Sequence, residues 1–362
     1  ADVKWCVYAM KKQAFQGRRK ATWRARAGVS ALSLVLSLAA MSLPAQAEEG
    51  RLSLRERIAQ RRAATAPTPA AAALPLTPGD HEIRVAHQGL ERKVVVHVPR
   101  AAEAGQPLPL VLALHGGGGF AEFMADDTRY GLIRAADEGG FIVAFPNGYS
   151  RFAGGRLATW NAGACCGDAR DRQVDDVGFL RAVVAQLQAR APIDPARIFA
   201  TGMSNGGMMA YRLACEASDL FRAVASVAGT DNTLQCTPAR PVSVLHIHAR
   251  DDDHVLFDGG AGPGAFRDAS KVTDFTSVPE TMRRWAQRDR CEGAPQRTQS
   301  FAGASCEAYA RCAQGVRVEL CVTDSGGHSW PGGVTRRGKP SASPAFDASS
   351  LIWSFFSASA AR

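Results

Sequence analysis

The chain alternates between short apolar runs and amphipathic stretches. Residues 110–114 and 141–145 are nearly continuous apolar runs that end in Gly-rich or Pro-Asn-Gly turns, which is typical of parallel strands buried on both faces. By the same pattern we expect strands at 197–202, 223–227 and 242–248, and helices at 121–138, 175–189, 205–215, 278–289 and 346–356. This strand–helix alternation predicts an α/β fold: a mostly parallel central sheet with helices on both faces.

Two further regions predict antiparallel pairs. Runs of β-forming residues at 81–87 and 92–98 flank Gly89, so we expect a hairpin at the N-terminal edge of the sheet. A two-stranded ribbon is expected near 305–322. If this ribbon turns at 312–315, Cys306 faces Cys321 across it.

The N-terminal segment has the pattern of an export signal. An apolar run at 27–43 precedes Ala45-Gln46-Ala47, so cleavage is expected after Ala47. The alternative is an uncleaved N-terminal anchor, but the apolar run is short for a membrane span and is interrupted by serines. Besides Lys4, the basic residues before it are Lys11, Lys12, Arg18, Arg19, Lys20, Arg24 and Arg26, against Asp2 alone among acidic residues.

This partition changes the meaning of length and charge. The 362-residue chain has 43 Lys and Arg against 34 Asp and Glu, a net charge of +9, but the first 47 residues account for +7 of it. The remaining +2 leaves no basic face for nucleic acid. Residues 48–80 hold a short charged helix and an Ala/Pro-rich spacer, which leaves 81–362 as one domain.

A candidate nucleophile follows the strand at 197–202. Residues 202–206 read Gly-Met-Ser-Asn-Gly, which places Ser204 on a strand-to-helix turn. Such an elbow strains the backbone of the serine and needs small residues beside it, and it presents the hydroxyl above the sheet. We therefore predict that Ser204 is the nucleophile and that the Asn205 N–H points at the forming oxyanion.

Glycines at 116–119 follow the strand at 110–114. Because glycine lets backbone N–H groups approach a ligand closely, we expect this loop to supply the other oxyanion donor. Gly117 N–H is the first choice for this donor, and Gly118 N–H is the second choice. A phosphate-binding loop is the alternative, but no Gly-Lys-Ser/Thr follows. We expect His115 to hold the loop structurally.

The general base and its acid should follow the last two strands, because the chain order in such sites is Ser, then Asp or Glu, then His. His328 alone fits the base, and Asp251, Asp252 and Asp253 follow the strand at 242–248. Chemistry does not choose among the three aspartates.

His246, His248 and the aspartates also invite a metal interpretation, but His254 lies six residues beyond His248, which departs from the usual ligand spacing. Burial of both histidines at a strand end is the simpler expectation, so we predict no metal site.

Several segments together resemble the secreted polyhydroxybutyrate depolymerase and feruloyl-esterase-type α/β-hydrolases, close to carbohydrate esterase family 1. The resemblance covers most of 79–335, and its motifs lie at 114–119, 145–148, 160–167, 174–177, 202–207 and 327–333. It implies an α/β-hydrolase fold, Asp252 as the acid and Trp330 in the acyl pocket. Ala249-Arg250 depart from the Gly-Thr of the family at the acid. Asp175 and Asp176 are expected to cap a helix.

The eight cysteines after the leader are an even number in an exported chain, which favours disulfides. Topology makes Cys215–Cys236 a plausible pair, the ribbon register suggests Cys306–Cys321, and the family resemblance implies Cys291–Cys312. The pairing of the adjacent Cys165 and Cys166 stays open.

The sequence thus predicts a secreted serine esterase, extracellular or periplasmic, that needs no cofactor and has no stable membrane insertion after cleavage. The resemblance implies hydroxyalkanoate polyesters or oligomers as substrate, with feruloyl or acetyl esters of plant polysaccharide as the alternative. A non-catalytic surface protein of the same fold is a further alternative. The oligomeric state stays open.

Overall fold

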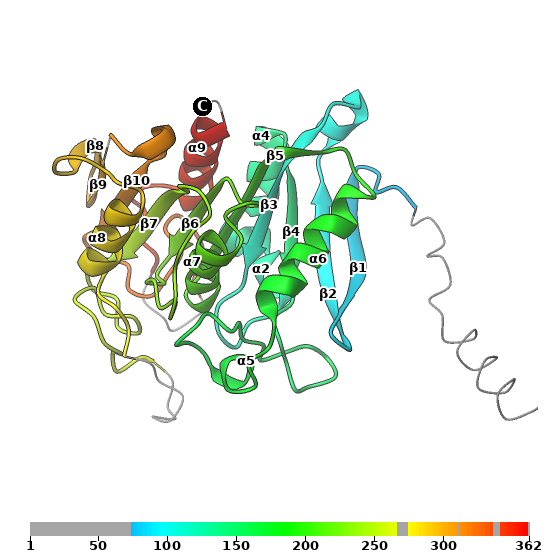
Figure 1. Cartoon of the computed structure of the whole chain (residues 1–362), viewed down its shortest axis with the longest axis horizontal. Helices are drawn as coiled ribbons and strands as arrows, with labels where there is room; N and C mark the ends of the chain where they lie inside the picture. Colours follow the sequence, from blue (N-terminus) through cyan, green and yellow to red (C-terminus); the bar gives the residue numbers. More distant parts are fainter. Residues whose placement is uncertain (1–73, 266–273, 310, 336–340, 361–362) are drawn as a thin grey trace, which may run out of the picture. The chain divides into compact units, whose positions relative to one another are not determined.

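The computed structural model describes residues 74–265, 274–309, 311–335 and 341–360. At its centre is one sheet of ten strands in the order β1-β2-β4-β3-β5-β6-β7-β10-β9-β8 (Figure 1). The predicted export signal and residues 48–73 of the predicted spacer lie outside the described residues and stay predictions. Among the described helices, none combines the length and the apolar character that crossing a membrane requires.

The middle of the sheet is parallel, as predicted. Every residue of β3, β4, β6, β7 and β10 is buried, because helices cover both faces of the sheet there. The parallel strands are β4 (Ile142–Pro146), β3 (Leu108–Leu114), β5 (Ile193–Met203), β6 (Ala223–Val227), β7 (Ser243–Ala249) and β10 (Val318–Thr323).

Antiparallel strands close both edges of the sheet. The predicted hairpin forms the first edge as β1 (Gly79–His87) and β2 (Leu90–Val98). The predicted ribbon pairs β9 (Ala304–Tyr309) with β10, and β8 (Gln296–Phe301) extends it outward. The sequence did not predict β8, because all of its side chains except Phe301 are polar and exposed and so show no apolar alternation. Polar side chains suit such an edge strand, since they discourage pairing with another chain.

Helices pack on the two faces of the sheet and form two apolar cores. One core includes side chains of α6 (Asp176–Gln188), α7 (Asn205–Glu216) and α8 (Val278–Arg288). The other includes side chains of α4 (Leu132–Gly139) and α9 (Ala348–Ala360). Figure 1 shows α6, α7 and α8 on the near face of the sheet. The predicted α/β-hydrolase fold, with helices on both faces, is confirmed.

The single helix predicted at 121–138 is wrong. The segment forms three short helices, α2 (Ala121–Met124), α3 (Asp127–Tyr130) and α4. Asp126 starts α3 as its N-cap by accepting the Thr128 N–H at 3.2 Å. Gly131, with φ of 62°, ends it in the left-handed conformation. Local hydrogen bonding therefore interrupts the apolar periodicity. A further short helix, α5 (Gly167–Asp171), was not predicted.

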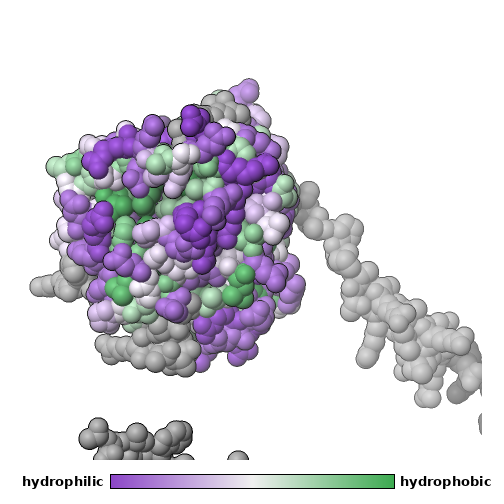
Figure 2. All heavy atoms as spheres, turned by 60° about the vertical axis from the view of Figure 1, so that its left-hand side comes forward, coloured by the Kyte–Doolittle hydropathy of each residue, from purple (hydrophilic) through white to green (hydrophobic). Residues whose placement is uncertain are grey.

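The surface of the domain is mixed. In Figure 2, hydrophilic residues cover most of the face turned forward, and apolar residues form smaller patches between them. The large apolar side chains that are most exposed include Leu157, at 64%, and Val334, at 63%.

All three suggested disulfides are present: Cys215–Cys236, Cys291–Cys312 and Cys306–Cys321. Cys306 lies opposite Cys321 in the β9–β10 register, as the ribbon geometry predicted. The remaining pair, Cys165 and Cys166, are bonded to each other.

Candidate active site

Ser204 occupies the turn between β5 and α7, where the sequence placed it. Its backbone angles, φ 54° and ψ −121°, lie in a region that non-glycine residues rarely adopt. A Cβ on Gly202 would lie 2.4 Å from the backbone of Gly206, and a Cβ on Gly206 would lie 2.2 Å from the Leu114 carbonyl oxygen. Both flanking positions therefore require glycine, which is the steric demand of a nucleophile elbow.

The glycine loop after β3 lies against this elbow. The Gly118 N–H donates to the Ala158 carbonyl at 2.8 Å, and the Gly119 N–H donates to Gly116 at 2.9 Å. The Gly117 N–H has no acceptor among the described residues, and Asn205 begins α7, where an N–H lacks an intrahelical acceptor. Gly117 and Asn205 therefore remain available as oxyanion donors, whereas Gly118, the second choice from the sequence, is occupied.

His115 holds the glycine loop, as expected. Its Nδ1–H donates to the Gly116 carbonyl at 2.8 Å, and its Nε2 accepts the Gly148 N–H at 2.9 Å. The indole N–H of Trp160 donates to the His115 carbonyl at 2.9 Å. Burial lowers the pKa of His115 to about 4, so the imidazole is neutral at neutral pH.

This burial predicts a loss of stability in acid. Because the unfolded chain binds a proton at His115 more readily than the folded chain, acidification from about pH 6.5 to about pH 4 should remove about 3 kcal/mol of folding free energy. Between these two pH values, the melting temperature of His115→Gln should fall less than that of the parent, as measured by circular dichroism. Parallel losses in the two proteins would contradict this role.

His328 and Asp252 meet at the carboxyl ends of β10 and β7. The Nδ1 of His328 lies 2.8 Å from Oδ2 and 3.1 Å from Oδ1 of Asp252. The Asp252 side chain is buried, which by itself would raise its pKa. Hydrogen bonds from His248 and His328 outweigh burial and hold the pKa of Asp252 well below its usual range. Asp252 is therefore a carboxylate that can orient His328 and stabilise its cation.

The three neighbouring aspartates have different contacts. Asp251 accepts the backbone N–H groups of Gly327, at 2.8 Å, and Gly326, at 3.3 Å, and so holds the loop that carries His328. Asp253 is exposed and lies 2.6 Å from the Nδ1 of His254. Of the three carboxylates, the structure places Asp252 against the His328 ring.

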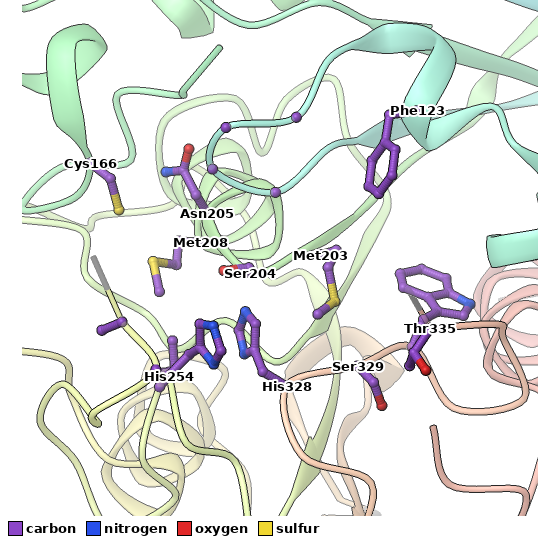
Figure 3. A pocket seen from close by; sticks show the side chains of 18 of the residues that line it. Phe123, Cys166, Met203, Ser204, Asn205, Met208, His254, His328, Ser329 and Thr335 are labelled. Carbon is purple, nitrogen blue, oxygen red and sulfur yellow. The ribbon is translucent and has the colours of Figure 1, made fainter. Parts of the chain in front are cut away.

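His254 is a pocket residue that sequence reasoning did not single out. Its ring stacks on His328, with centroids 4.4 Å apart and planes 13° apart (Figure 3). Ligand atoms of Asp252, His254 and His328 lie within 4.8 Å of one another. The lone pairs of stacked imidazoles point along parallel planes and do not converge on one ion. Burial, followed by the charge of His328, lowers the pKa of His254 despite Asp253.

One pocket of about 590 Å³ contains Ser204, His328, His254 and the glycine loop. Figure 3 shows Cys166 and Met208 on one side of Ser204, and Met203 and Phe123 on the other. The predicted acyl-pocket residue, Trp330, also lines this cavity.

Aromatic side chains form the wall on the Phe123 side. Trp330 contacts Tyr130 edge to face at 5.4 Å, and Tyr130 contacts Phe123 in the same way at 6.0 Å. The indole N–H of Trp330 donates to Ser349 at 3.1 Å, which fixes the ring. The wall is therefore a rigid apolar surface.

Two motifs outside the pocket have structural roles. Asp175 caps α6 by accepting the Gly178 N–H at 2.9 Å, as predicted, and Asp176 forms a buried ion pair with Arg92. His246 and His248 are buried and hydrogen-bonded to each other at 3.0 Å, so these two nitrogens are engaged rather than free to bind a metal.

Sheet topology, nucleophile elbow and the His328–Asp252 contact together define an α/β-hydrolase. A family model described as "Putative esterase" matches residues 86–330. The chain belongs to this esterase family, and the predicted relationship to feruloyl-esterase-type hydrolases is confirmed.

Two sequence relatives agree with this assignment. The chain is 32% identical over 243 residues to feruloyl esterase B of Piromyces equi, a match that covers 66% of this chain and 42% of that esterase. It is 35% identical over 249 residues to the putative esterase NocK of Nocardia uniformis subsp. tsuyamanensis, covering 65% of this chain and 69% of the relative. Among solved structures, an acetyl xylan esterase from Aspergillus awamori aligns with a TM-score of 0.47 and 14% identity, over 74% of this chain and 94% of that one.

Proposed function

We propose that this protein is a serine esterase that hydrolyses carboxylic esters through Ser204, His328 and Asp252. One observation carries the proposal: the strained Ser204 shares a pocket with His328, whose Nδ1 contacts a buried carboxylate. Membership of an esterase family supports it.

The chemistry follows from the positions of these groups. Asp252 accepts the Nδ1–H of His328, which leaves Nε2 as the base. As the Ser204 oxygen attacks the ester carbonyl, Nε2 takes its proton and then gives that proton to the departing alcohol. The N–H groups of Gly117 and Asn205 stabilise the oxyanion. Water, deprotonated by Nε2, then releases the acid from the acyl-enzyme.

We further propose that the acyl group is a planar hydroxycinnamoyl group. The wall formed by Phe123, Tyr130 and Trp330 offers aromatic faces and edges to such a ring. The relative from Piromyces equi is named a feruloyl esterase, which supports this choice.

Hydroxyalkanoate oligomers are the second candidate. Leu157 and Val334 line the pocket and are mostly exposed, so its rim could contact an apolar polyester. The disulfides Cys215–Cys236, Cys291–Cys312 and Cys306–Cys321 support action outside the cytoplasm, as the predicted export signal requires.

Steady-state kinetics on three substrates test the proposal. We expect kcat/KM for methyl ferulate to exceed that for a hydroxybutyrate trimer and for nitrophenyl acetate. Phe123→Ala should lower kcat/KM for methyl ferulate about tenfold and affect nitrophenyl acetate much less, because only the ferulate reaches the aromatic wall. Phe120→Ala is the matched control, since Phe120 contacts Phe123 but does not line the pocket.

Two results would change the assignment. A higher kcat/KM for the trimer would favour the polyester candidate. Absence of hydrolysis of all three esters by the folded protein would contradict esterase function and favour the non-catalytic alternative.

A further inference from the structure

Behind Asp252 lies a row of buried polar side chains that the reaction does not touch. The hydroxyl of Tyr211 lies 2.8 Å from Nδ1 of His246, and Nε2 of His246 lies 3.0 Å from Nδ1 of His248. The Nε2 of His248 lies 2.8 Å from the Val255 carbonyl and 3.3 Å from Oδ2 of Asp252. Tyr211 comes from α7 and both histidines come from β7.

The Val255 carbonyl determines the directions of these hydrogen bonds. A carbonyl only accepts, so Nε2 of His248 carries the hydrogen that it gives to Val255. In a neutral imidazole Nδ1 is then an acceptor, so His246 donates from Nε2. The Nδ1 of His246 must in turn accept, so Tyr211 donates its hydroxyl hydrogen. With both rings neutral, each donor points along the row from Tyr211 to His248, and the last hydrogen goes to the Val255 carbonyl beside Asp252.

All three side chains of the row are buried, and burial favours the neutral state of His246. Tyr211, His246 and His248 are all at most 1% exposed. Burial, helped by the neighbouring His248, lowers the pKa of His246 well below its usual value. Apolar side chains would fill such positions at lower cost in desolvation. The polar chain therefore calls for an explanation beyond packing.

We propose that Tyr211, His246 and His248 form a positioning chain that fixes the tautomer of His248 and thereby the place and charge distribution of Asp252 behind His328. This inference rests on the proposed esterase mechanism. None of the three residues touches substrate. They act through the carboxylate that orients the base, and Val255 links the chain to the same carboxylate by donating its N–H to Asp252 at 3.0 Å.

The positioning chain predicts the direction in which the acid limb of the pH profile should move when His248 is replaced. The N–H of His248, given to Val255, also lies close to Oδ2 of Asp252, with Nε2 at 3.3 Å from that oxygen, and so stabilises the carboxylate. Without it, the Asp252 carboxylate is less stabilised and attracts the His328 cation more strongly. The acid limb of kcat/KM should therefore move to higher pH. A loss of folding alone would lower activity at every pH and leave the limb in place.

Other charged groups near these residues remain unchanged in the variants. The pocket side of His328 faces His254 with Asp253, the loop of His328 is held by Asp251, and Arg129 lines the same pocket beside Asp126. The charges of Asp231 and Arg288 act on Tyr211, and these two residues form an ion pair with Nη1 of Arg288 at 2.5 Å from Oδ2 of Asp231. Because these groups are the same in the parent and in the variants, a shift of the acid limb of kcat/KM is caused by the change in the positioning chain.

The experiment compares full pH profiles of kcat and kcat/KM on a soluble ester. We expect His248→Leu to lower kcat about tenfold, with little change in KM, and to raise the acid limb by about 0.5 pH unit. His248→Gln keeps an N–H near the place of Nε2 and should restore the profile. Tyr211→Phe removes one hydroxyl and keeps the stacking on Trp285, so it should shift the limb in the same direction by less.

Ile247→Ala is the matched control. Ile247 is equally buried on β7 but points to the opposite face of the sheet, so its loss should lower the melting temperature without moving the limb. An unshifted limb in both His248→Leu and Tyr211→Phe would overturn the positioning chain, as would an equal shift in Ile247→Ala. If His248→Leu does not fold, Tyr211→Phe and His248→Gln decide. Activity that survives Ser204→Ala would instead overturn the underlying mechanism.

Discussion

Replacing Ser204 with alanine is expected to lower kcat for ester hydrolysis about 10⁶-fold while the fold survives. In the proposed mechanism the hydroxyl oxygen is the atom that forms the acyl-enzyme, and the described residues offer no substitute for it at the elbow. Alanine adds no atoms, so the close contacts of Gly202 and Gly206 are undisturbed. The measurement is turnover of nitrophenyl acetate, with circular dichroism to verify folding.

Ser329 provides the matched control for this substitution. It also lines the pocket, but its hydroxyl donates to the Gly326 carbonyl at 2.7 Å and so serves the loop. Ser329→Ala should lower kcat at most about tenfold. A fluorophosphonate should label the parent and Ser329→Ala but not Ser204→Ala. Turnover of the Ser204 variant within a hundredfold of the parent would place the nucleophile elsewhere.

The elbow could be predicted because its requirements are local. Gly202, Ser204 and Gly206 lie within five residues, and the steric reasons for the two glycines act between neighbouring parts of the chain. The buried parallel strands were predictable for a similar reason. Burial on both faces demands continuous apolar runs, and β3 and β4 show them directly.

Contacts between distant segments could not be predicted in the same way. The sequence left Asp251, Asp252 and Asp253 equivalent in chemistry, since each precedes His328 by about the same distance along the chain. The turn after β7 decides their directions: one carboxylate meets the loop backbone, one meets the ring and one lies at the surface. Family resemblance chose Asp252, and this is the carboxylate that lies against the His328 ring.

The chain behind Asp252 shows a second limit. His246 and His248 are two residues apart on β7 and so share a face of the sheet. Their partner Tyr211 is 35 residues away on α7, and nothing in the spacing pairs it with His246. A pair of histidines on one strand face could equally have bound a metal. Only the positions of Tyr211 and Val255 show that hydrogen bonds engage the ring nitrogens.

Asp252→Asn is expected to lower kcat about 10⁴-fold. Oδ1 of Asp252 accepts the backbone N–H groups of His254, at 2.8 Å, and Val255, at 3.0 Å, so an asparagine should keep its carbonyl oxygen there. Its NH₂ group then falls at the place of Oδ2, 2.8 Å from Nδ1 of His328. The amide donates where the carboxylate accepted, which forces the proton of His328 onto Nε2. A protonated Nε2 cannot take the proton of Ser204.

The two neighbouring aspartates give the comparison that makes this result specific. Asp251→Asn retains an oxygen that can accept the Gly327 N–H, and Asp253→Asn changes an exposed side chain that contacts His254 rather than His328. Each should keep kcat within about tenfold of the parent. All three variants carry the same change in charge within three residues, so general electrostatics cannot separate them. If Asp251→Asn or Asp253→Asn proves the most impaired, the orienting acid is not Asp252, and the contact between Asp252 and His328 is structural.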